Sequence, residues 1–129
     1  MTEKHIQTVK DLIIRYRSLT EEEITGVMQT KGCEVFEVLR ILTGFGAIDS
    51  CSLCKNIKEE YNRLACEHCI WGDADYTDGR YPCTQRGRGD TYCLVRESNT
   101  VQQLLYSVRA RAKLMELILE EEILEEEIE

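Results

Sequence analysis

The sequence lacks several features that would assign the chain to a common class of protein. No apolar run approaches the roughly 20 residues that a helix needs to span a bilayer, and the polar start at Met1–Lys10 is unlike a signal peptide. We therefore expect a soluble, cytoplasmic protein with no membrane partner. There is also no Gly-rich phosphate loop before a helix, no Cys–His pair spaced for nucleophilic catalysis and no complete EF-hand around Asp73–Gly79. These absences favour a protein that is not an enzyme.

Basic side chains are missing from the C-terminal segment. Residues 116–129 hold eight glutamates and no Lys or Arg, which leaves sixteen acidic and sixteen basic residues in the rest of the chain. The net charge of -8 therefore belongs to a tail, and the low isoelectric point does not argue against nucleic-acid binding by the body. We expect the tail mainly to aid solubility; binding a basic partner and competing with DNA are the alternatives.

Hydrophobic periodicity predicts one domain made mostly of helices. With 129 residues, 43% of them hydrophobic, the chain can form a single modest core. Apolar residues recur at helical spacing in Glu3–Leu19, in a second helix after Thr20 and in a third over Cys33–Thr43. Thr20 with Glu23 is typical of a capping box, and Gly32 is suited to the end of the second helix.

The second half of the chain predicts a hairpin and a long helix. Residues 80–85 and Thr91–Arg96 are expected to be two short strands around the Gly-rich turn Arg86–Asp90. Ser98 is expected to cap a last helix that carries a heptad seam, which we expect a second copy of the chain to cover. The seam consists of Val101, Leu105, Val108, Ala112, Met115 and Leu119.

This order of elements resembles a winged helix-turn-helix domain. The residues that carry the resemblance are 18–24, Val35, 38–42 and 46–48, which are similar to the first helices of that family. The resemblance implies an α+β winged-helix domain from residues 1–48 and 80–97, a Cys-rich insert at 49–79 and a C-terminal dimerisation helix at 98–129. The chain departs from the family in this insert of about thirty residues between recognition helix and wing.

By resemblance, residues 33–43 are the recognition helix and residues 86–90 the tip of the wing. The candidate DNA contacts are Arg86 and Arg88 in the wing, Thr30 and Lys31 before the third helix, and Arg40 within it. Glu34 and Glu37 repel phosphate, which favours contact through the wing over base recognition by the helix. They also suit an alternative function, an adaptor that binds proteins of a transcription complex.

The strongest chemical signal is a pair of Cys-x-x-Cys motifs in the insert. Cys51 and Cys54 are separated by eleven residues from Cys66 and Cys69. Two such pairs complete a tetrahedral thiolate site, so we expect structural zinc, with a 4Fe-4S cluster as the alternative.

Three more cysteines and two histidines are less informative. Cys83 and Cys93 lie at equal distance from Arg88, so they are expected to face each other across the hairpin as an inert pair, a reversible disulfide or alternate metal ligands. Cys33 is expected to be a packing residue. His68 lies between two candidate ligands and could replace one of them, but it is expected to face solvent, as is His5.

Taken together, the sequence predicts a homodimeric DNA-binding transcription regulator with a structural or sensing metal site. The alternatives are the protein-binding adaptor and an iron–sulfur redox sensor.

Overall fold

The computed structural model of the protein describes residues 2–46, 51–63, 68–71 and 91–128. Within these ranges the regular secondary structure is helical and contains no strand. The helices are α1 (Glu3–Ser18), α2 (Glu21–Lys31), α3 (Val35–Thr43), α4 (Ser52–Tyr61), α5 (Thr91–Arg96) and α6 (Val101–Ile128). The expectation of a mainly α fold is confirmed.

The first two helices begin and end where the sequence indicates. Thr20 accepts a hydrogen bond from the amide of Glu23 at 3.2 Å, which caps α2 as predicted. Gly32 then ends α2 with φ of +63°, a left-handed conformation that suits glycine. The carboxylate of Glu23 accepts two hydrogen bonds from Arg15 of α1, at 2.7 and 3.1 Å. This ion pair fixes α2 against α1.

The third helix is shorter than predicted. It begins at Val35, after Glu34, whose side chain and that of Glu37 form a reciprocal capping box. Cys33 precedes this cap and is half-buried against the core, which confirms its packing role.

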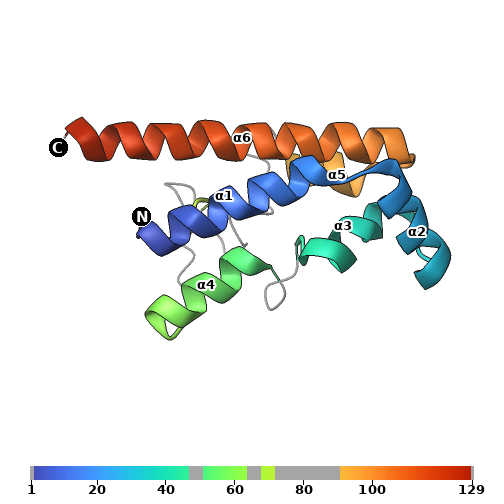
Figure 1. Ribbon diagram of the computed structural model, residues 1–129, viewed down its shortest axis with the longest axis horizontal. Helices are drawn as coiled ribbons and strands as arrows, with labels where there is room; N and C mark the ends of the chain where they lie inside the picture. Colours follow the sequence, from blue (N-terminus) through green and yellow to red (C-terminus); the bar gives the residue numbers. More distant parts are fainter. Residues whose placement is uncertain (1, 47–50, 64–67, 72–90, 129) are drawn as a thin grey trace.

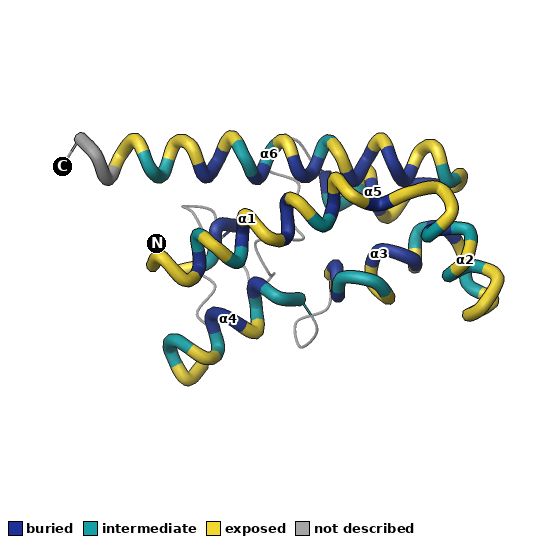
Figure 2. The backbone as a smooth tube through the Cα atoms, in the orientation of Figure 1, coloured by how far each residue is buried: buried dark blue, intermediate teal, exposed yellow. Residues whose placement is uncertain are grey.

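Helices α1 and α6 form the centre of the molecule. They lie side by side and run in opposite directions, with α5 next to α6 and α4 next to α1 (Figure 1). Figure 2 shows the buried residues of α6 on the side that faces α1. The fully buried side chains of this core include Val9, Leu39, Leu104, Val108, Ala112 and Met115.

The heptad seam of the last helix is therefore covered within one chain. Val108, Ala112 and Met115 have no exposed surface, and Leu105 and Leu119 are buried, although only one copy is present. Val101 is partly buried against the same core. The helices that cover the seam are α1 and α5, so these residues give no reason for a second copy to bind here.

The predicted second strand of the wing is wrong. Thr91–Arg96 forms the short helix α5, and its buried residues Thr91 and Val95 are four positions apart, on one face of the helix. The predicted first strand and the predicted turn, residues 80–90, lie outside the described residues. The cap of the last helix also differs from the prediction, because Thr100 accepts a hydrogen bond from the amide of Gln103 at 3.1 Å.

The Cys-rich insert contains a helix that the sequence analysis did not predict. In α4, Leu53, Asn56 and Ile57 form a buried face that packs next to α1. Among the described residues, no helix combines the length and apolar character needed to cross a membrane.

Candidate metal centre

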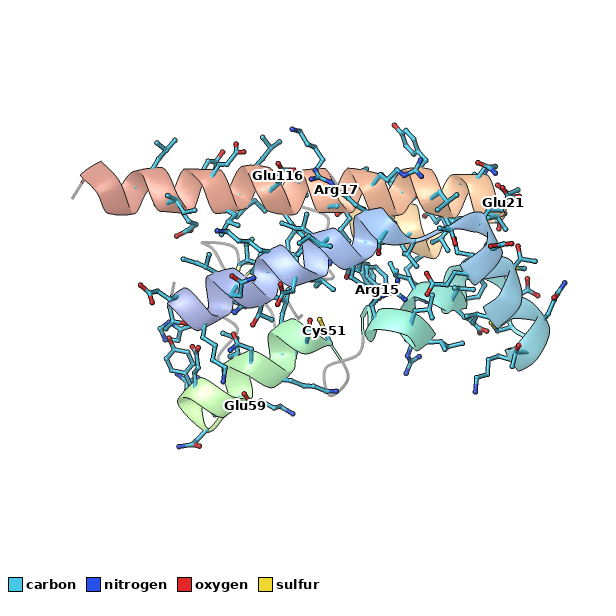
Figure 3. The ribbon with its side chains drawn as sticks, in the orientation of Figure 1. Arg15, Arg17, Glu21, Cys51, Glu59 and Glu116 are labelled. Atoms are coloured by element: carbon cyan, nitrogen blue, oxygen red, sulfur yellow. The ribbon has the colours of Figure 1, made fainter. Side chains whose placement is uncertain are left out.

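The first Cys-x-x-Cys pair lies at the start of α4. Cys51 occupies the N-cap, and its carbonyl oxygen accepts a hydrogen bond from the amide of Lys55 at 3.0 Å. Figure 3 shows Cys51 at the end of α4 that lies nearest α3. The thiol of Cys54 and the backbone amides of Leu53 and Cys54 lie near its sulfur and favour its negative charge. The helix N-terminus thus presents its unsatisfied amides to a sulfur atom.

These interactions favour the thiolate form of Cys51. The hydrogen bond from the Cys54 thiol is the main cause that lowers the pKa of Cys51 to about 6, against the opposing effect of burial. The two backbone amides and the positive charge of Arg111 lower the pKa further. Because a thiolate is the form that binds metal ions and attacks electrophiles, Cys51 is prepared for either chemistry near neutral pH.

Arg111 of α6 supplies a buried positive charge beside this site. Its guanidinium lies 4.3 Å from the ring centre of Trp71 and 4.8 Å from that of Phe45, and it donates to the hydroxyl of Thr91 at 3.1 Å. Trp71 follows the second Cys pair by two residues, and Phe45 precedes the first pair by six. Arg111 therefore holds together segments next to both pairs.

Tyr16 of α1 closes this polar region from another side. Burial raises the pKa of Tyr16 to about 12, although the neighbouring Arg111 and Thr43 lower it. The phenol therefore stays neutral at physiological pH and leaves Arg111 as the positive group of the region.

The prediction that His5 faces solvent is wrong. Only 1% of its surface is exposed, and its ring nitrogens contact two other segments. Nδ1 lies 2.7 Å from Oδ1 of Asn56 in α4, and Nε2 accepts a hydrogen bond from the amide of Ile70 at 3.1 Å. His5 thus fixes the residue after Cys69 to both α1 and α4. The spacing of 4, 3 and 4 from His5 through Val9, Leu12 and Tyr16 was the signal that could have revealed its burial.

The second Cys pair is described only in part. Cys69 is half-buried against the same hydrophobic core as Cys51, whereas Cys66 lies outside the described residues. No three Cys, His, Asp or Glu side chains of the described segments come together as metal ligands, and no disulfide joins the cysteines there. His68 is exposed, as predicted, and stacks on Tyr61 with ring centres 4.2 Å apart.

The structure places the alternate ligand Cys93 in a helix and not in the predicted hairpin. Cys93 is half-buried in α5, so it cannot face Cys83 across two strands, and Cys83 lies outside the described residues.

The candidate DNA contacts fall in two groups. Thr30 and Lys31 at the end of α2 and Arg40 in α3 are exposed, whereas Arg86 and Arg88 lie outside the described residues. Arg40 lines a groove of about 910 Å³ between α1, α3 and the start of α4. The charged residues of this groove are Asp11, Arg15, Glu37, Arg40 and Lys55. Because acidic and basic groups alternate, the groove is not a uniformly positive surface.

Comparison with protein-family models, with curated proteins and with solved structures finds no match to this chain.

Proposed function

We propose that the protein is a small helical domain that binds one metal ion through thiolates, with Cys51 and Cys54 as two of the ligands. The observation that carries this proposal is the position of Cys51 at the N-cap of α4, where Cys54 and backbone amides favour its thiolate. Polar groups around a ligand, such as amides at a helix N-terminus, orient and stabilise metal-bound thiolates. Cys66 and Cys69 are the proposed remaining ligands, because their motif repeats the spacing of the first pair.

Zinc is the proposed metal, and a 4Fe-4S cluster is the alternative. Four thiolates suit both, but a structural zinc ion needs only a closed tetrahedral site next to a folded core. The buried guanidinium of Arg111 fits either centre, since four thiolates leave a net negative charge with both.

Elemental analysis of anaerobically purified protein, with an absorption spectrum of the same sample, tests this proposal. We expect about one zinc per chain and a colourless sample. A brown sample with several irons per chain would establish the cluster instead. A wild-type protein with neither metal would refute the proposed centre.

Serine substitutions identify the ligands. Cys51→Ser, Cys54→Ser, Cys66→Ser and Cys69→Ser should each lower the bound metal. Cys33→Ser is the matched control, because this half-buried thiol lies before α3 and packs against the core. Cys83→Ser and Cys93→Ser should retain the metal. If either variant loses it, that cysteine is a ligand in place of Cys66 or Cys69.

DNA binding is a second candidate function, favoured by the exposure of Thr30, Lys31 and Arg40 around the turn from α2 to α3. In this proposal the protein is a transcription regulator, and the metal centre stabilises the domain or senses metal or redox state. Arg86 and Arg88 are proposed as further phosphate contacts. Glu34 and Glu37 oppose deep insertion of α3 into a groove, so contact is proposed with phosphates rather than bases.

Fluorescence anisotropy with a random DNA duplex at low and moderate salt distinguishes a regulator from an adaptor. Phosphate contacts make the affinity fall steeply with salt, and each contact removed lowers the logarithmic slope by about one. Arg86→Ala with Arg88→Ala, and Lys31→Ala with Arg40→Ala, should each reduce this slope. Lys10→Ala, an exposed cation on α1, is the control. If the protein does not bind the duplex at low salt, DNA binding is excluded and the protein-binding adaptor is the remaining proposal.

A further inference from the structure

Helix α6 carries a second apolar stripe on the side that faces away from α1. Tyr106, Leu117 and Leu124 are 71%, 44% and 56% exposed, although all three have large apolar side chains. Ala110 lies beside them and is half-buried. Figure 2 shows exposed residues along this outer side of α6. We name these four residues, Tyr106, Ala110, Leu117 and Leu124, the outer stripe.

The outer stripe has the spacing of a helix-pairing surface. Ala110, Leu117 and Leu124 are each seven residues apart, and Tyr106 precedes Ala110 by four. This repeat keeps the residues on one face over most of a helix that is 28 residues long, or about 42 Å. Scattered exposed apolar residues need no explanation, but a stripe with heptad spacing marks a surface for association.

Charged residues on the same side of α6 are segregated by sign. The exposed Arg109 and Lys113 lie in its N-terminal half, and the exposed Glu120, Glu121 and Glu125 lie in its C-terminal half. Two parallel copies would place glutamates beside glutamates, which is unfavourable. Two antiparallel copies would place the basic half of each helix beside the acidic half of the other.

We propose that two copies of the chain associate through the outer stripes of their α6 helices, in antiparallel orientation, with Leu117 at the two-fold axis. Lys113 lies four residues before Leu117 and Glu120 three residues after it. In this arrangement Lys113 of each copy comes level with Glu120 of the other, within about one residue's rise of 1.5 Å. The interface is therefore opposite to the heptad seam, which the chain's own helices already cover.

Measurement of molecular mass by analytical ultracentrifugation over a range of protein concentrations tests the association. The wild type should form a dimer that weakens as salt is added. Leu117→Lys should shift the dissociation constant at least tenfold or abolish the dimer. Ile14→Lys is the matched control, because Ile14 is 64% exposed on α1 and lies outside the outer stripe. A wild type that stays monomeric at every concentration, or a dimer that Leu117→Lys leaves unchanged, would overturn the proposal.

A charge exchange separates the contact from any effect on folding. Lys113→Glu should weaken the dimer, and the double variant Lys113→Glu with Glu120→Lys should restore it, because the pair between copies is rebuilt with its signs reversed. Circular dichroism of each variant confirms that α6 is retained. If the double variant does not restore the dimer, the proposed antiparallel pairing of Lys113 with Glu120 is wrong.

Cross-linking with a short bismaleimide determines the orientation, with the wild type measured as background for the native cysteines. Leu117→Cys should cross-link between copies because it lies at the two-fold axis. Leu124→Cys should not, because its two copies would lie about 21 Å apart along the antiparallel helices. Equal cross-linking at both positions would indicate parallel helices and overturn the proposed arrangement.

Discussion

At the scale of single residues, His5 shows how burial and hydrogen-bond partners keep an ionisable side chain neutral. Asn56 offers a carbonyl oxygen to Nδ1, and the amide of Ile70 donates to Nε2, so Nδ1 carries the proton and Nε2 is bare. Burial is the largest cause that lowers the pKa of His5, although Asn56 and the charge of Glu60 raise it and the N-terminal charge lowers it. The neutral ring is therefore the form that the fold requires.

Stability should consequently fall as the solution becomes acidic. The unfolded chain takes up a proton at His5 near pH 6.5, whereas the folded chain does so only at lower pH. The contribution of neutral His5 to the free energy of unfolding is thus complete above about pH 6.5. It is lost as the pH falls through the lowered pKa of the folded state. Urea unfolding at pH 7.5 and 5.5 should show a smaller loss for His5→Gln, which does not titrate, than for wild type. His68→Gln, at an exposed position, should keep the wild-type difference; an equal loss in all three would exclude His5 as its cause.

Arg111 is the second residue whose surroundings define its role. Two aromatic rings stack against its planar guanidinium, and Thr91 accepts a hydrogen bond from it at 3.1 Å. Lysine keeps the charge but cannot stack between two rings or donate in the same plane. Arg111→Lys should therefore lower the free energy of unfolding by about 1–3 kcal/mol. Arg109→Lys, two residues away and exposed, should change it by less than about 0.5 kcal/mol. Equal effects in the two variants would show that the stacked geometry contributes nothing specific.

At the scale of helices, sequence periodicity predicted α1, α2, α3 and α6, because each has apolar residues at helical spacing. The caps of α2 were also recognisable in the sequence. It failed for α5, where the position of Thr91–Arg96 after a Gly-rich turn suggested a strand. Thr91 and Val95 instead bury the same side of a helix, and Tyr92 stacks on Phe45 with ring centres 5.2 Å apart. Tertiary contacts with the core and α6 override local propensity in so short a segment.

The candidate site was predicted only in part for a similar reason. Spacing identified the Cys pairs, but the helical spacing of Leu53 and Ile57 was not recognised. Spacing could have indicated that His5 is buried, but not which groups His5 and Arg111 contact, because their hydrogen-bond partners lie 20 to 65 residues away in the sequence. Such contacts depend on how helices pack, which periodicity does not specify.

The two glycines of α2 allow a test at this scale. Gly26 lies inside the helix, and a Cβ added there would meet nothing within 4 Å. Gly26→Ala should stabilise the protein by about 0.5–1 kcal/mol, because alanine favours the helix. Gly32 has φ of +63°, so Gly32→Ala should destabilise the protein by about 1 kcal/mol. Urea unfolding measures both, and effects of the same sign would contradict the assigned end of α2.

At the scale of the whole molecule, α6 is the element on which the others assemble. It contacts α1, α2, α3 and α5, and its buried residues extend from Leu104 to Leu119. Its periodicity correctly indicated that Leu105, Val108, Ala112, Met115 and Leu119 are buried, but not what covers them. An apolar stripe on a helix can be covered by other helices of the chain or by a second copy. In this protein the packing of α1 and α5 against α6 covers it.

A comparison of Met115 with Leu117 tests this assignment. Met115 has no exposed surface in a single copy, whereas Leu117 is 44% exposed on the outer stripe. Met115→Ala should cost about 2–5 kcal/mol of unfolding free energy at any protein concentration, because it opens a cavity in the core of one chain. Leu117→Ala should cost the monomer less than about 0.5 kcal/mol, and any larger effect should appear only at concentrations where dimers form. Urea unfolding at dilute and concentrated protein checks both. If the cost of Met115→Ala instead depended on concentration, the heptad seam would be the interface between copies and α1 would not be its cover.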